Sequence, residues 1–371
     1  MCKDLMRTQS DQYLAAGLRI AVGPGGRSRW RRLMEDALRT QCENMQVPAD
    51  DAAPDILFRD YGELASVAPS DVVGANYSVR DGAFVDHRSR NALRFSGGQL
   101  IYWHDVSLTL SIPQVVQIAL VQKGRSFVHS AAVSIGGRAH VFPGFGGIGK
   151  TLLVSDLMRH PGAKLLGDDL VVLNPAGTVQ SYARPFCLYP YHRGAFKQQF
   201  SALGIRHMRP AFPWRVYRRI RMESAYRYGA RLPWPGRYLG IDHDYVLASP
   251  YVLFGPDRIE TSQVPLETVA VVKRSASASR VSVDTTVDVE QLSAFCASVT
   301  AHEWNHSART LLAFDALSAG TRVGFFEGTR AAISRCLPQA SRVALITLPD
   351  QFRPEEYFAA VRELIGLRTT V

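Results

Sequence analysis

The sequence predicts an α/β protein in which a core with a mixed sheet follows a smaller α/β accessory region. Three observations support this fold class. Two strand-like runs are joined by Gly136 and Gly137, a glycine-rich stretch directly follows the second run, and an apolar segment with two adjacent acids comes next. We place the accessory region at residues 1–120 and the core domain at residues 121–371.

Size, composition and charge narrow the class of protein. With 371 residues, of which 46% are hydrophobic, the chain can bury a substantial core. No run approaches the roughly 18 apolar residues of a membrane helix, and the first residues lack the apolar block of a secretory signal. We therefore expect a cytoplasmic protein with no membrane partner. The five cysteines form no CxxC pair, and the net charge of +10 suits phosphate, acidic peptide or nucleic acid equally.

The first part of the chain contains one helix-like and several strand-like stretches. Residues 29–41 have the spacing of an amphipathic helix, and ALRFSGGQLIYWHDVSLTL is typical of strands. In the core domain, VHSAAVSI and RAHVFPG predict a hairpin, because Gly136-Gly137 suits a tight turn. We expect a helix from about Lys150 to Arg159, then KLLGDDLVVLN as one apolar strand interrupted by its two acids.

The second half of the core domain begins with a change in composition. Residues 201–250 are rich in Arg, Tyr, Trp and Pro, and we interpret them as an irregular basic insertion. Beyond it, ETVAVVKRS predicts a strand, and residues 287–319 predict one long helix. RVALITLP and EEYFAAVRELIG predict a closing strand and helix.

The stretch GFGGIGKT satisfies the pattern G-x-x-x-x-G-K-[ST] between a predicted strand and a predicted helix. Glycines let successive backbone N–H groups turn inward around phosphates, and the start of the helix adds the positive end of its dipole. Lys150 supplies a charge to the terminal phosphates, and the Thr151 hydroxyl can ligate Mg²⁺. This predicts ATP and Mg²⁺ as cofactors, held by Gly144, Gly146, Gly147, Ile148, Gly149, Lys150 and Thr151.

Asp168 and Asp169 are adjacent acids within an apolar segment. Burying two carboxylates there is costly unless a metal, a lysine or an acceptor hydroxyl uses them. One can hold magnesium or its waters, while the other can take a proton from an acceptor alcohol. The alternative is a strand end that emerges into solvent, where acids are ordinary.

The order of these features resembles the catalytic domain of HPr kinase/phosphorylase, a family related to the phosphoenolpyruvate carboxykinase type of phosphate-loop fold. His129 starts a strand and is followed by a hairpin, the loop ending in GIGKT, a helix and the paired aspartates. The separation between His129 and the first loop glycine is also similar to that in the family. The resemblance covers residues 127–175 well and the remainder loosely.

The resemblance implies a role for each matching residue. His129 would lie near the transferred phosphate, Lys150 would contact it, and Thr151 with Asp168 would bind the metal. Asp169 would be the proton acceptor. Residues 233–238, PWPGRY, look like the loop that closes on the phosphate in that family, so Arg237 would clamp the transferring group; a plain exposed turn is the alternative.

One departure limits what the resemblance implies. The stretch ARPFCLYPYHRG stands where the bifunctional enzymes have a glutamate that supplies a further metal contact. Phosphorylation of HPr and the reverse phosphorolysis are therefore not expected. The chain looks more like related kinases that act on a hydroxyl, such as a serine, of a peptide, protein or small molecule, and a homo-oligomer stays open.

Two other classes compete with a kinase. One is a nucleotide-binding regulatory module without catalysis. The other is a zinc hydrolase, because His302 and His306 match HExxH and Glu327 is within range as a third ligand. An apolar face on the same predicted helix argues against zinc; it comprises Leu292, Phe295, Val299 and Leu311. Residues 206–237 could neutralise nucleic acid, a partner we disfavour because no known nucleic-acid module accompanies them.

Overall fold

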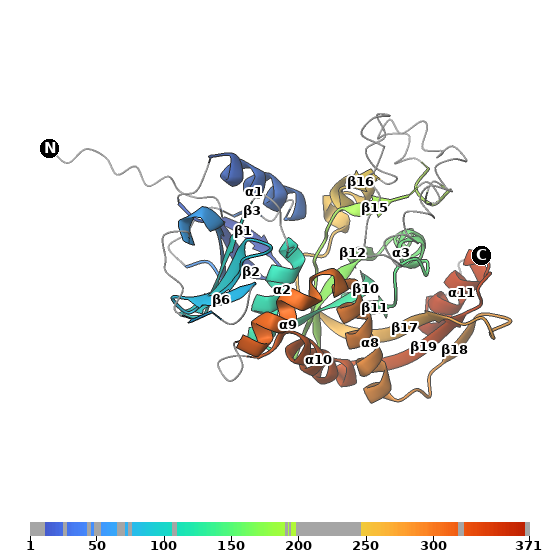
Figure 1. Ribbon diagram of the computed structural model, residues 1–371. Coiled ribbons are helices and arrows are strands. Elements are labelled where there is room, and N and C mark those ends of the chain that lie inside the picture. The colour runs from blue at the N-terminus through green and yellow to red at the C-terminus, as the bar shows by residue number, and fades with distance from the viewer. Residues whose placement is uncertain are drawn as a thin grey trace, which may run out of the picture. The chain divides into compact units, whose positions relative to one another are not determined.

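The computed structural model describes residues 12–24, 28–42, 46–47, 53–64, 71–72, 76–105, 110–189, 192, 194–197, 246–317 and 323–367. The chain divides into two compact units. The larger comprises Met1–Arg184 and Asp257–Val371, and the smaller comprises Pro185–Pro256. Helices and mixed sheets together confirm the predicted α/β class (Figure 1). No helix among the described residues is long and apolar enough to cross a membrane.

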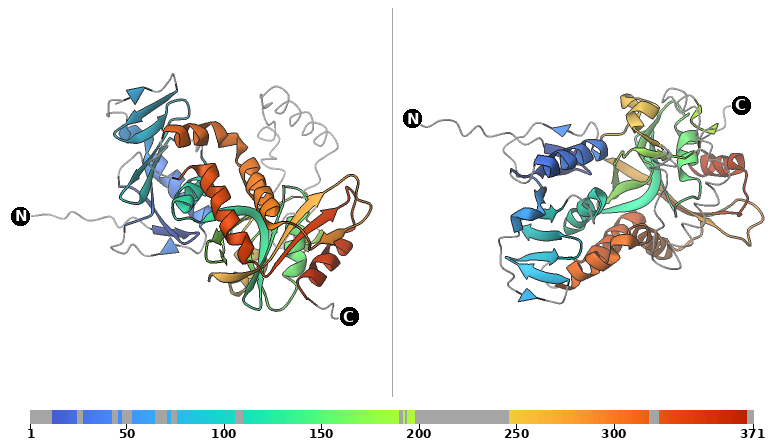
Figure 2. Two further views of the ribbon diagram at one scale, coloured as in Figure 1. Left: turned by 90° about the horizontal axis from the view of Figure 1, so that it is seen from below. Right: turned by 45° about the horizontal axis from the view of Figure 1, so that its top comes forward.

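The first sheet of the larger unit is built from the N-terminal strands (Figures 1 and 2). Its strand order is β3-β1-β2-β4-β9-β8-β7-β6-β5. β4 pairs in parallel with β2 and β9, and the other pairs are antiparallel. The helix predicted at residues 29–41 is confirmed as α1 (Ser28–Gln41). The strands are β1 (Gln12–Ala15), β2 (Leu18–Val22), β3 (Gln46–Val47), β4 (Ile56–Asp60), β5 (Asp71–Val72), β6 (Tyr77–Arg80), β7 (Ala83–Asp86), β8 (Asn91–Ser96) and β9 (Gln99–His104).

The second sheet has eight strands in the order β11-β10-β13-β14-β17-β19-β18, with β12 also paired to β10. β11 pairs with β17 as well as with β10, and β11, β17 and β19 run parallel. The predicted hairpin is confirmed, because Ile135 lies opposite Arg138 and both intervening glycines have positive φ. The strands are β10 (Ser126–Ile135), β11 (Arg138–Pro143), β12 (Ala163–Gly167), β13 (Leu170–Asn174), β14 (Thr178–Gln180), β17 (Val264–Arg274), β18 (Ser282–Asp284) and β19 (Arg342–Leu348).

Helices link and cover the sheets of the larger unit. α2, which is buried from Ile112 to Val121, contacts both β9 and β10. α8 and α10 pack against each other and against β10, and their apolar residues share a core cluster with strand residues of the second sheet. α3 contacts β10 and α11. The helices are α2 (Ile112–Gln122), α3 (Lys150–Leu157), α8 (Val289–Glu303), α9 (Ala308–Leu317), α10 (Phe325–Cys336) and α11 (Pro354–Leu364).

The single long helix predicted at residues 287–319 is wrong, because the chain forms α8 and α9 with a 3₁₀ turn, Asn305–Ser307, between them. α8 ends where Trp304 enters the core. Its indole packs against Phe127, with ring centroids 6.4 Å apart, and against Phe325 at 5.4 Å. Burial of this large side chain outweighs the helix propensity of the segment.

KLLGDDLVVLN also differs from the prediction, because it forms two strands rather than one. β12 pairs with the second half of β10, and β13 pairs with its first half. Asp168 and Asp169 form the step, the two-residue connection between β12 and β13. The amide of Ser130 on β10 donates to the Asp169 carbonyl across this step (3.0 Å). The two acids therefore lie between strands and not within one.

The smaller unit contains the antiparallel pair β15 (Phe186–Leu188) and β16 (Val246–Ala248), followed by α7 (Pro250–Phe254). Three aromatic rings, those of Phe186, Phe196 and Phe254, pack against one another. The predicted basic insertion at residues 201–250 lies outside the described residues, apart from residues 246–250.

Candidate active site

The glycine-rich loop connects the end of β11 to the start of α3, as predicted from its pattern. Two positions of the loop require glycine. A Cβ added to Gly144 would collide with the Ile148 side chain and lie 2.6 Å from the Val272 carbonyl oxygen. Gly149 has φ +96°, a conformation that other residues adopt only at a cost. A larger residue at either position would therefore force the loop backbone to move.

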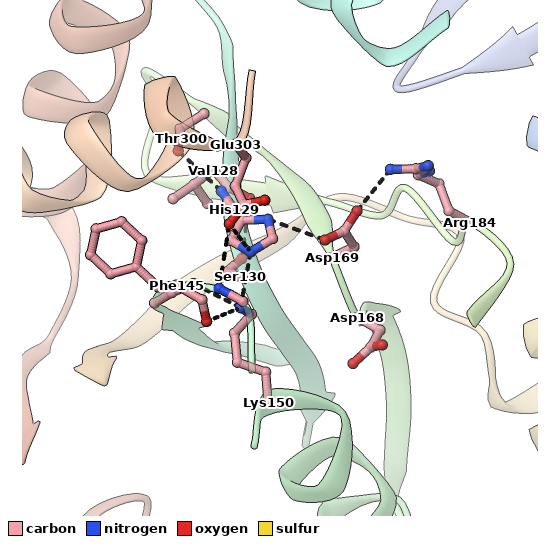
Figure 3. Close-up of polar contacts among 12 residues, drawn as sticks. Val128, His129, Ser130, Phe145, Lys150, Asp168, Asp169, Arg184, Thr300 and Glu303 are labelled. Atoms are coloured by element: carbon pink, nitrogen blue, oxygen red, sulfur yellow. Dashed lines mark hydrogen bonds and ion pairs between the residues drawn. The ribbon is translucent and has the colours of Figure 1, made fainter. Parts of the chain in front are cut away.

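Lys150, the first residue of α3, lies folded beneath this loop with 7% of its surface exposed (Figure 3). Its ammonium donates to the carbonyl oxygens of Gly144 (2.7 Å) and Phe145 (2.9 Å) and to His129 Nε2 (2.9 Å). Burial lowers the pKa of Lys150, although nearby carboxylates oppose this shift. The three hydrogen bonds therefore hold the Lys150 ammonium at the loop.

His129 on β10 joins this lysine to the paired acids. Because the ammonium can only donate, His129 Nε2 is the acceptor, and Nδ1 carries the proton that faces Asp169 Oδ1 at 3.1 Å (Figure 3). The His129 backbone is held by α8, since its amide donates to Thr300 Oγ1 (3.1 Å). Lys150, His129 and Asp169 therefore form one continuous chain of contacts.

Asp169 accepts from both sides. Besides His129, Arg184 donates to its second carboxylate oxygen at 2.8 Å. Burial alone would raise the pKa of Asp169, but the hydrogen bond from His129 and the positive charges of Arg184 and Lys150 lower it below its usual range. Its side chain is still 49% exposed, so a second molecule can reach the carboxylate.

Asp168 has a different environment. Its Oδ2 accepts from Thr151 Oγ1 at 2.9 Å, whereas its Oδ1 is buried and has no hydrogen-bond partner among the described residues. Burial raises the pKa of Asp168 to about 7. A hydroxyl and a carboxylate with an unsatisfied oxygen are hard ligands of the kind Mg²⁺ prefers. The arrangement fits Thr151 and Asp168 as the residues that would hold magnesium.

Glu303, the last residue of α8, is a site residue that the sequence analysis did not assign to the loop. Its Oε1 accepts from the Gly146 amide at 3.3 Å and lies 3.5 Å from His129 Nε2 (Figure 3). Phe145 of the loop also packs edge-on against Phe295 and His302 of the same helix. No sequence pattern links Gly146 to a residue 157 positions away. Arg184, 15 residues after Asp169 and within the quoted ARPFCLYPYHRG stretch, was also not predicted as a site residue.

The single helical face that a zinc site at His302 and His306 needs is not formed. α8 ends at Glu303, so His306 falls in the following 3₁₀ turn, while the ring of His302 packs against Phe145. Glu327 begins a separate helix, α10. Among the described residues, which include all three, no group of three or more His, Cys, Asp or Glu is placed to hold a metal ion.

Two predicted features are not placed. Arg237 with its PWPGRY stretch, and the basic segment at residues 206–237, lie outside the described residues. The remaining predicted site residues, from the loop to the paired acids, come together in one place (Figure 3).

In comparisons with known proteins, no protein-family model matches this chain and no curated protein matches it. The resemblance to HPr kinase/phosphorylase stays a prediction from the residues quoted for it. An assignment of function must therefore be argued from the geometry of the site.

Proposed function

We propose that this chain is a kinase that uses ATP and Mg²⁺ to phosphorylate a hydroxyl of a peptide, protein or small molecule, with serine as the favoured acceptor. One observation supports this above the others. The contacts run without a break from the loop lysine, Lys150, through His129 to Asp169, so a phosphate-binding group and a proton acceptor are held together.

The loop and α3 would bind the polyphosphate. Backbone N–H groups at the start of a helix favour anions, and Lys150 lies at the same point with three donors. Magnesium, when bound to Thr151 and Asp168, would neutralise charge on the phosphates. Phosphoryl transfer of this type depends mainly on positioning and electrostatics, which these groups can supply.

Asp169 would orient the acceptor. The hydroxyl oxygen forms a bond to the γ-phosphorus, the bond from phosphorus to the bridging oxygen breaks, and ADP leaves. The hydroxyl proton passes to Asp169. Because the pKa of Asp169 is lowered, it is a weak base at the start, and the proton moves as the new bond makes the hydroxyl more acidic. His129 and Arg184 hold its two oxygens in place.

A regulatory module that binds nucleotide without catalysis is the second candidate. It is favoured by the contacts that Asp169 already makes at both oxygens, with the His129 ring and with the Arg184 guanidinium, because they leave this carboxylate less able to take a proton. Such a protein would need the loop and Lys150 but not Asp169.

One experiment distinguishes the kinase from the regulatory module. The protein is incubated with Mg²⁺, γ-labelled ATP and pooled peptides and metabolites, alongside Lys150→Ala, Asp169→Asn and, as a control, the exposed Lys164→Ala. A kinase labels an acceptor, loses ATP binding in Lys150→Ala, and loses only transfer in Asp169→Asn. ATP binding that needs Lys150 but labels nothing supports the regulatory module. Absence of ATP binding by the unmodified protein overturns both.

A further inference from the structure

The loop sits at one edge of the second sheet, where several parallel strands end. β11, β17 and β19 run parallel, so their carboxyl ends meet at the same edge. β11 leads into the glycine-rich loop, β17 ends at Arg274, and β19 leads to Phe352 before α11. The glycine-rich loop, Arg274 and Phe352 therefore lie at or after the ends of strands that end on the same side of the sheet.

Arg274 and Phe352 both contact the loop. The Arg274 guanidinium donates to the Gly147 carbonyl at 3.1 Å and lies over the Phe352 ring, 5.3 Å from its centroid. The Phe352 ring in turn lies against Gly149, where an added Cβ would be 3.5 Å from Cζ. Arg274 is therefore an exposed side chain that is held against the loop from two sides.

The loop has different chemistry on its two sides. β11 pairs with β10 on one side, and β10 and β13 bring His129 and Asp169. On the other side β11 pairs with β17, which brings Arg274. A polyphosphate that directs its terminal phosphoryl group towards the acids would extend its nucleoside away from β10, and Arg274 lies on that side of β11.

We propose that Arg274, supported by Phe352, is the stacking surface for the base of the nucleotide. This inference rests on the proposed nucleotide-binding function and extends it to a second subsite. A planar guanidinium stacks on aromatic rings, and bases stack on such groups whatever their hydrogen-bonding edges. Purines, with the larger ring system, are the class that this surface should prefer.

The test compares two ligands by isothermal titration calorimetry in the presence of Mg²⁺. ATP has a base, whereas inorganic tripolyphosphate reports on the loop alone. Phe352→Ala and Arg274→Lys, which keep the positive charge beside the loop, are expected to weaken ATP binding by roughly 5- to 100-fold and to leave tripolyphosphate binding unchanged. Arg274→Ala also removes that charge, so it should weaken the binding of both ligands, and that of ATP by the larger factor.

Arg280→Ala is the matched control, because Arg280 is exposed, lies near Arg274 in sequence and has no contact with the loop in the described contacts. Equal weakening of ATP and tripolyphosphate would make Arg274 a phosphate ligand and overturn the inference. So would unchanged ATP binding in both Phe352→Ala and Arg274→Lys. Failure of the unmodified protein to bind either ligand would instead overturn the proposed function, and this subsite with it.

Discussion

Glu303→Gln should tighten nucleotide binding, because this carboxylate occupies an amide that the loop would offer to phosphate. Glu303 Oε1 lies 3.3 Å from the Gly146 nitrogen. A phosphate oxygen that uses the same amide brings its negative charge within a few ångströms of the carboxylate. The amide side chain of glutamine keeps the shape of the residue and removes the repulsion.

The size of the effect follows from Coulomb's law. Two unit charges about 4 Å apart at an effective dielectric constant near 20 repel by about 4 kcal/mol. The Glu303 side chain is 32% exposed and Lys150 lies close by, so solvent and the neighbouring ammonium screen much of this. A residual of about 1–2 kcal/mol corresponds to roughly 5- to 30-fold tighter binding.

Calorimetric titrations with ATP, ADP and tripolyphosphate measure this directly. Glu303→Gln should bind all three ligands more tightly, because the removed repulsion acts on the phosphates and not on the base. Glu290→Gln, in the first turn of the same helix and exposed, is the control and should change none of them. Weaker binding in Glu303→Gln would refute the argument and indicate that the carboxylate supports the ligand, as it would by holding the metal.

Three further predictions follow from the contacts of single residues. Asp169→Asn should slow phosphoryl transfer by about 10²–10⁴-fold with ATP affinity retained, measured with labelled ATP once an acceptor is found; transfer at the normal rate would remove Asp169 as the base. Gly144→Ala should cost about 1–3 kcal/mol in urea denaturation because its Cβ meets the Val272 carbonyl. Gly146→Ala, whose nearest contact is 3.7 Å away, should unfold like the unmodified protein, and equal losses would contradict the steric argument. Burial lowers the pKa of His140 to about 4. Between pH 6.5 and that pKa the unfolded chain therefore binds a proton at His140 that the folded chain does not. The free energy of unfolding should fall as pH decreases through this range, by at most about 1.4 kcal/mol per pH unit. His140→Gln should reduce that slope in denaturation at pH 7 and pH 5, and an unchanged slope would show that His140 is not its source.

Much of the site could be predicted because its signals are local. The hairpin follows from Gly136-Gly137, and the loop follows from glycines whose positions tolerate no Cβ or need a positive φ, such as Gly144 and Gly149. The resemblance implied that His129 and Lys150 each lie beside a transferred phosphate, and the structure places the two side chains in contact with each other.

The errors occurred where tertiary contacts override local preference. Trp304 ends α8 because its ring is buried between aromatic residues distant in sequence, and that ending separates His302 from His306. The step at Asp168 and Asp169 exists because β12 and β13 pair with different halves of β10.

Residue order alone was enough to predict a glycine-rich turn between a strand and a helix, since the glycines and the lysine that define it lie within eight consecutive residues. Which groups surround that turn was a matter of three-dimensional packing. Glu303 and Arg274 reach the turn from a helix end and a neighbouring strand, and Arg184 reaches Asp169 from a strand connection. Their approach depends on the burial of apolar side chains throughout the larger unit, a collective effect that no short stretch of sequence encodes.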